Sequence, residues 1–172
     1  DIFVSGGGAD NQLGYNWICR HFGNDYRLHR FDQEKFAGHL DTHFAIIRPG
    51  LLLTYYPKDF LPEYFHNWDI IYLDPAADRE ISNQQVLYDE KIQDDDFVNT
   101  VVSTNILSID QNTIMLLDHL KNNKYLLNQL ERFGVEPLFV KFTYSHFFNQ
   151  GLTCITLDTV RDTNGCIDYK NL

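Results

Sequence analysis

The chain has few cysteines, and no pair of them has metal-site spacing. Its 172 residues include three cysteines, Cys19, Cys154 and Cys166, and no C-x-x-C pair. An odd, sparse set of this kind does not predict a disulfide framework or a zinc knuckle. It fits a reducing compartment, so we expect a cytoplasmic location, where one well-placed thiol becomes a candidate nucleophile.

Basic residues are also in short supply. The chain carries 14 lysines and arginines against 24 aspartates and glutamates, which gives a formal net charge of -10. Nucleic-acid binding needs a basic stripe, and none is visible, so we expect no nucleic-acid partner. The same acidity argues against an anionic membrane surface, and no apolar run approaches the length of a membrane span.

What the chain does contain predicts one packed domain over residues 1–172. Hydrophobic residues make up 44% of the sequence, with 13 phenylalanines and 10 tyrosines, which is enough for a sizeable core. One long polar connection, Pro75 to Asp96, interrupts the pattern. Long connections in compact domains are often lids or specificity loops.

Hydrophobic periodicity predicts a mixed α/β fold in which the order β-β-α-β recurs. The predicted strands are 1–5, 26–31, 43–48, 51–56, 68–73, 101–109, 113–117, 136–142 and 152–160. The predicted helices are 11–22, with an apolar stripe of Leu13, Trp17, Ile18 and Phe22, a short one at 58–64, and 123–134, ended by Gly134.

Three proton-active residues alternate in the stretch "GHLDTHFAIIRPG". His39, Asp41 and His43 would share one face if the strand began at the first of them. A metal site would need further ligands, and no second cluster has suitable spacing, so we predict none. A histidine beside a carboxylate is also a proton-transfer pair. The alternative is structural, with His43 at the edge of the core and His39 solvated.

Cys154 is the cysteine with the most suggestive position, since it follows Gly151 at the start of a predicted strand. A free cysteine is usually a buried, inert small hydrophobe. Its position at the start of a strand and its polar neighbours Thr153 and Thr156 argue against that interpretation, and a reactive thiol is the alternative. Cys19 is expected in the core and Cys166 on the surface.

Several blocks of the chain resemble the arginine amidinotransferases of the guanidine-modifying (pentein) superfamily. They are "DIF" at Asp1, "LGYNWICRHF", "DYRLHRF", "HLDTHFAIIRPGLLL", "STNILSID" and "GLTCITLDTVR". The resemblance implies a pentein-type propeller of ββαβ units, of which about three of five are present here. We therefore expect the chain to be the C-terminal part of a longer catalytic domain.

The resemblance also implies roles for individual residues. Cys154 matches the family's nucleophile, His39 its acid/base histidine, and Asp1 the aspartate that pairs with that histidine. Asp41 matches a carboxylate that holds the substrate guanidinium, and His43 is expected to have neither role. Candidates for further substrate contacts are Asn99, Ser103, Lys58 and Arg48.

The implied reaction moves the amidino group of arginine to an acceptor amine through a covalent amidino-cysteine, with no cofactor. The expected partners are small-molecule substrates, and the resemblance is compatible with a homodimer. Two alternatives remain open: a guanidine hydrolase that uses the same residues, and a catalytically silent chain that binds guanidino compounds or a partner chain.

Overall fold

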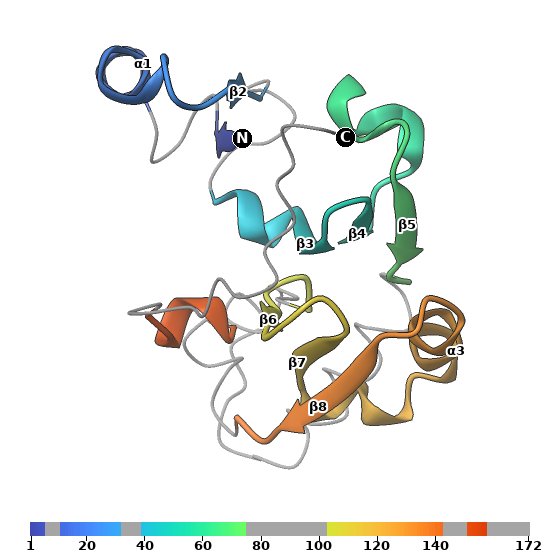
Figure 1. Ribbon diagram of the computed structural model, residues 1–172. Coiled ribbons are helices and arrows are strands. Elements are labelled where there is room, and N and C mark those ends of the chain that lie inside the picture. Colours follow the sequence, from blue (N-terminus) through green and yellow to red (C-terminus); the bar gives the residue numbers. More distant parts are fainter. Residues whose placement is uncertain (6–10, 32–38, 75–102, 143–150, 158–172) are drawn as a thin grey trace, which may run out of the picture.

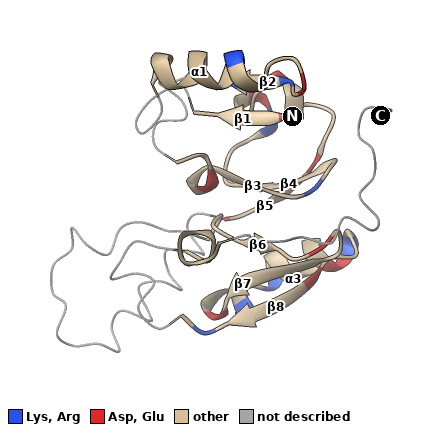
Figure 2. Cartoon of the chain, turned by 60° about the vertical axis from the view of Figure 1, so that its left-hand side comes forward, with Lys and Arg blue, Asp and Glu red and all other residues tan. Residues whose placement is uncertain are grey.

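The structure is a computed structural model that describes residues 1–5, 11–31, 39–74, 103–142 and 151–157. Its elements form stacked layers, which Figures 1 and 2 show from two directions: α1 with β1 and β2, then β3 to β5, then β6 to β8 with α3. Within these residues, every helix is too short or too polar to cross a membrane.

The first layer is a parallel pair of short strands, β1 (Ile2–Val4) and β2 (Leu28–Arg30), joined through helix α1 (Gln12–Phe22). Asn11 caps the helix by accepting a hydrogen bond from the Gly14 N–H at 2.9 Å. The expected apolar stripe of α1 is present but uncovered, since no residue of the helix is buried and Leu13 is 79% exposed. Cys19 is accordingly half-buried, and its expected place in the core is wrong.

The second layer is a sheet with the strand order β3-β4-β5. Its strands are β3 (Phe44–Arg48), β4 (Leu51–Thr54) and β5 (Asp69–Tyr72). β3 and β4 are antiparallel, β4 and β5 are parallel, and Gly50, at φ 84°, makes the tight turn between the first two. All four residues of the central strand β4 are buried, which explains its unbroken apolar run.

The helix expected at 58–64 is replaced by two short 3₁₀ helices, η2 (Lys58–Phe60) and η3 (Glu63–Phe65). Each begins directly after a proline, Pro57 or Pro62. A proline in the middle of an α-helix removes a hydrogen bond and clashes with the preceding turn, so Pro62 divides the segment in two.

The third layer has the strand order β6-β7-β8. Its strands are β6 (Leu107–Ser108), β7 (Thr113–Leu117) and β8 (Glu136–Val140), and η4 (Asp118–Asn122) and α3 (Lys124–Arg132) connect the last two. β6 and β7 are antiparallel and β7 and β8 are parallel, which repeats the pairing of the second layer. Gly134 follows α3 at φ 65°, the left-handed conformation that ends helices.

Two strand predictions are wrong in the described residues. Residues 103–106 precede β6 as a turn and an irregular segment, and residues 153–155 form the 3₁₀ helix η5 (Thr153–Ile155). The two segments bond each other, because the Leu152 N–H donates to the Asn105 carbonyl at 3.2 Å. This backbone contact takes the place of a continued ladder.

The second and third layers share one hydrophobic core. Its buried members come from both sheets and from α3: Ile47, Leu51, Leu53, Ile71, Leu73, Ile106, Ile114, Leu116, Leu120, Leu126, Leu130 and Val135. The other face of the second layer packs an aromatic cluster against β1 and β2: Phe31, Phe44, Leu52, Leu61 and Phe65, with Phe3 beside them. The described residues close no ring of sheets, so the five-unit propeller stays a prediction.

Two sets of side-chain hydrogen bonds also join the second and third layers. The Arg48 guanidinium donates to the carbonyls of Gln111 at 2.9 Å and Phe133 at 2.7 Å, and to the Asn112 side chain at 3.0 Å. The Gln129 carboxamide accepts from the Tyr72 N–H and donates to the Tyr72 carbonyl, both at 2.9 Å.

Replacing Arg48 with methionine is expected to lower the free energy of unfolding by about 1–3 kcal/mol, because charge-assisted hydrogen bonds to carbonyls are lost while the packed stem remains. Urea denaturation measures the change. The matched control is Arg20→Met on the exposed helix α1, which should change stability little. Equal effects of the two substitutions would show that Arg48 does not tie the layers.

Candidate functional site

Cys154 lies on η5, which is anchored to the third layer. Leu152, the residue directly before η5, is buried and packs in a small cluster with Leu117. After this anchor the chain turns outward, so Cys154 is exposed. The structure therefore does not fit a buried, inert thiol and leaves the sulfur open to a small molecule.

Asp41 connects the start of the second layer to η5. It lies on the 3₁₀ helix η1 (Leu40–Thr42), just before β3. Its Oδ2 accepts hydrogen bonds from Asn105 Nδ2 at 2.6 Å and from Thr153 Oγ1 at 2.7 Å. Within the part of the chain that the structure describes, no donor reaches Oδ1. One oxygen is thus anchored and the other is available to a cation.

Asn105 brings Asp41 and Cys154 together, and it is not among the predicted site residues. Its Nδ2 lies 3.5 Å from Cys154 Sγ as well as 2.6 Å from Asp41. Asn105 is almost fully buried, at 1% exposure. The available signal was its place in "STN", a polar triplet directly before an apolar strand.

His39 is exposed, and its backbone caps η1. Its carbonyl accepts from the Thr42 N–H at 3.1 Å and from Thr42 Oγ1 at 2.7 Å. The backbone is therefore fixed two residues from Asp41. The His39 ring has no hydrogen bond to another described residue.

His43 does not share a face with His39 and Asp41, because the strand begins only at Phe44 and the preceding residues form η1. Its Nδ1 lies 2.9 Å from the Tyr56 hydroxyl, and the two rings stack. Burial raises the pKa of Tyr56 above its ordinary value, so this hydroxyl stays protonated. Among the described residues, no group of three or more His, Cys, Asp or Glu side chains could hold a metal ion.

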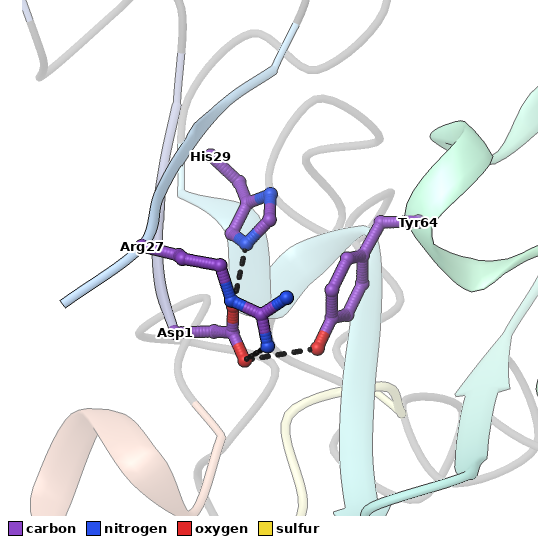
Figure 3. Close-up of polar contacts among 4 residues, drawn as sticks. All are labelled: Asp1, Arg27, His29 and Tyr64. Atoms are coloured by element: carbon purple, nitrogen blue, oxygen red, sulfur yellow. Dashed lines mark hydrogen bonds and ion pairs between the residues drawn. The ribbon is translucent and has the colours of Figure 1, made fainter. Parts of the chain in front are cut away.

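Asp1 belongs to a separate polar cluster, which Figure 3 shows. Its carboxylate lies 3.0 Å from Arg27 Nε, 2.8 Å from His29 Nε2 and 3.1 Å from the Tyr64 hydroxyl. Burial, together with the nearby positive charge of Arg27, lowers the pKa of His29. The neutral ring then donates from Nε2 to Asp1. Within the described residues, Asp1 thus orients His29, whereas the resemblance pairs it with His39.

The remaining predicted residues lie in different surroundings. Ser103 is buried, and its hydroxyl lies 3.1 Å from His119 Nε2. Lys58 is half-buried and donates to the Trp68 carbonyl at 3.1 Å. Arg48 lies at the opposite end of β3 from Asp41, where its guanidinium ties the two layers. Asn99 falls outside the described residues.

Curated proteins similar to this chain are amidinotransferases. The L-arginine:L-lysine amidinotransferase of Pseudomonas savastanoi pv. phaseolicola is 24% identical over 163 residues, which cover 94% of this chain and 41% of the relative. The mitochondrial glycine amidinotransferase of Gallus gallus is 26% identical over 165 residues, which cover 94% of this chain and 36% of the relative. The chain therefore spans about two fifths of the length of the curated relatives it matches.

A solved structure agrees with this likeness. The inosamine-phosphate amidinotransferase of Streptomyces griseus superposes with a TM-score of 0.71 at 22% identity, over 92% of this chain and 43% of the other. At this identity the match shows a shared mixed α/β fold. No family model matches the chain.

Proposed function

Since this chain belongs to the amidinotransferase family, we propose that its protein transfers the amidino group of arginine to an acceptor amine. Cys154 is the nucleophile and carries the amidino group between the two half-reactions. Asp41 holds the guanidinium of the donor. The proposal concerns the whole protein, of which this chain supplies the thiol and one carboxylate.

The observation that carries the proposal is the shared contact of Asp41 and Cys154 with Asn105 Nδ2. The carboxylate Oδ2 and the sulfur are no farther apart than the sum of the two contact distances, about 6 Å. A carboxylate pairs well with the planar guanidinium cation. A guanidinium bound at Asp41 is therefore brought to the exposed thiol, and its positive charge favours the thiolate that attack requires.

In the first half-reaction, the Cys154 thiolate attacks the central carbon of the guanidinium and forms a carbon–sulfur bond. The bond from that carbon to the side-chain nitrogen then breaks, and ornithine leaves as the amine after His39 donates a proton. The amidino group remains on sulfur. Asp41 keeps its pairing with the amidino group through Oδ1 throughout.

In the second half-reaction, the acceptor amine attacks the same carbon while His39 removes its proton. The carbon–sulfur bond breaks, which releases the guanidino product and the thiolate. Asp1 could orient His39 only after its carboxylate leaves Arg27, His29 and Tyr64. Lys58, Ser103 and Asn99 are proposed to contact the substrates, and Arg48 is a weaker candidate because its guanidinium is already engaged.

The test is to incubate the intact protein with arginine alone and to analyse the peptides by mass spectrometry. The expected result is one amidino group on Cys154 and one equivalent of ornithine, since no acceptor is present to complete the cycle. Sustained release of urea or citrulline in water would favour the guanidine hydrolase instead. Binding of arginine with neither adduct nor product would favour a catalytically silent chain.

A further inference from the structure

We propose that Asn105 is a positioning residue that holds the Cys154 thiol and the Asp41 carboxylate in one arrangement. Gly151, which has no side chain, leaves the space that the Asn105 side chain occupies. This inference rests on the proposed function, because it concerns the same two groups. It deepens that function by naming what keeps a nucleophile and a cation-binding carboxylate side by side.

The hydrogen bonds of Asn105 fix the orientation of its carboxamide. Its Oδ1 accepts from the Thr153 N–H at 2.7 Å, so the other end of the group must be the nitrogen. The Asn105 carbonyl also accepts from the Leu152 N–H at 3.2 Å. These two contacts hold the N-terminal end of η5, and they leave Nδ2 directed at the sulfur and at Asp41.

The two protons on Asn105 Nδ2 have an electrostatic consequence. A thiolate beside a carboxylate is disfavoured, because like charges at short distance repel each other. An amide nitrogen that donates to both anions offsets this repulsion, and its burial at 1% exposure strengthens the effect. Asn105 therefore offsets the repulsion between the Asp41 carboxylate and the attacking sulfur.

Gly151 leaves the space that this arrangement needs. A Cβ atom built on Gly151 would lie 2.4 Å from Cβ and Oδ1 of Asn105. Both residues are buried, so the short Asn105 side chain has little room to retreat. A side chain at position 151 must therefore push Asn105 or η5 out of place.

The first test replaces Asn105 with aspartate, which has almost the same shape. The substitution removes both donated hydrogen bonds and adds a negative charge beside the sulfur. We expect alkylation of Cys154 by iodoacetamide at neutral pH to slow about tenfold or more, and its pH profile to move towards higher pH. Peptide mass spectrometry separates Cys154 from Cys19 and Cys166.

The matched control is Asn123→Asp. Asn123 is also buried, but it caps α3, where an aspartate is an equally good cap. Its side-chain nitrogen has no hydrogen-bond partner to lose among the described residues. This variant should alkylate at the wild-type rate. Thermal unfolding of both variants checks that each is folded.

The second test reaches the same contact from the other side, through Gly151→Ala. We expect slower alkylation of Cys154 and at least about a tenfold loss of kcat/KM, since small displacements of reacting groups are costly. Gly14→Ala is the control, because the nearest atom to its added Cβ, Asn11 Oδ1, lies at an ordinary 3.7 Å.

The outcomes separate this inference from the proposed function. Folded Asn105→Asp and Gly151→Ala variants that alkylate like the wild type would overturn the inference, whatever the enzyme does. If both variants are alkylated more slowly and the wild-type protein transfers no amidino group, the inference stands and the proposed function is refuted. If Asn105→Asp does not fold, a wild-type rate of Cys154 alkylation in the Gly151→Ala variant is enough to overturn the inference.

Discussion

Replacing Cys154 with serine is expected to lower the kcat/KM of amidino transfer by about 10³-fold or more, because a hydroxyl is a far weaker nucleophile than a thiolate at neutral pH. The exposed position of Cys154 means that the smaller oxygen should not disturb packing. Steady-state assay of the guanidino product measures the loss. Arginine binding should persist, since Asp41 is unchanged.

Cys19→Ser is the control for this prediction, since Cys19 is half-buried on α1 in the first layer, whereas Cys154 lies on η5. It should retain nearly full activity. Wild-type turnover by Cys154→Ser, or covalent amidino labelling at any other residue, would refute the assignment of the nucleophile.

Replacing Asp41 with asparagine is expected to reduce kcat/KM for arginine by about 10²–10³-fold, mainly through a higher KM. Two donors, Asn105 Nδ2 and Thr153 Oγ1, converge on Oδ2, so the oxygen of the new amide must stay there. The amide nitrogen then takes the outward position of Oδ1. It presents donors to the guanidinium where the wild type presents an acceptor and a negative charge.

Asp118→Asn is the matched control, because Asp118 makes a surface ion pair with Lys121 at 3.1 Å and exposed pairs of this kind contribute little. Its KM for arginine should match the wild type. If Asp41→Asn instead lowers kcat and leaves the KM unchanged, Asp41 acts on the reacting thiol and does not bind the donor.

Local patterns predicted most of the secondary structure. The bounds of β7, 113–117, agree with the prediction, and α3 ends before Gly134 because a glycine can adopt its positive φ. Prediction failed where a remote contact decided the backbone. Residues 153–155 are apolar enough for a strand, yet η5 forms there because Leu152 and Thr153 bond Asn105.

The candidate site was predictable only in part, for the same reason. The prediction of Asp41 and Cys154 as site residues rests on their resemblance to family motifs, and 64 and 49 positions separate Asn105 from them. A local sequence pattern does not predict a contact between residues so far apart in the chain. The partner of Asp1 likewise depends on a remote contact. The parallel pairing of β1 with β2 places His29, and not His39, beside Asp1.

The contact between Gln129 and Tyr72 has a consequence for how the second layer ends. Within the described residues β5 is an edge strand, and a free edge can recruit a strand from another chain. The Gln129 carboxamide occupies the N–H and the carbonyl of Tyr72 just as a neighbouring strand would. A helix side chain thus makes the hydrogen bonds of a neighbouring strand at this residue. Growth of the sheet past β5 would first have to displace α3.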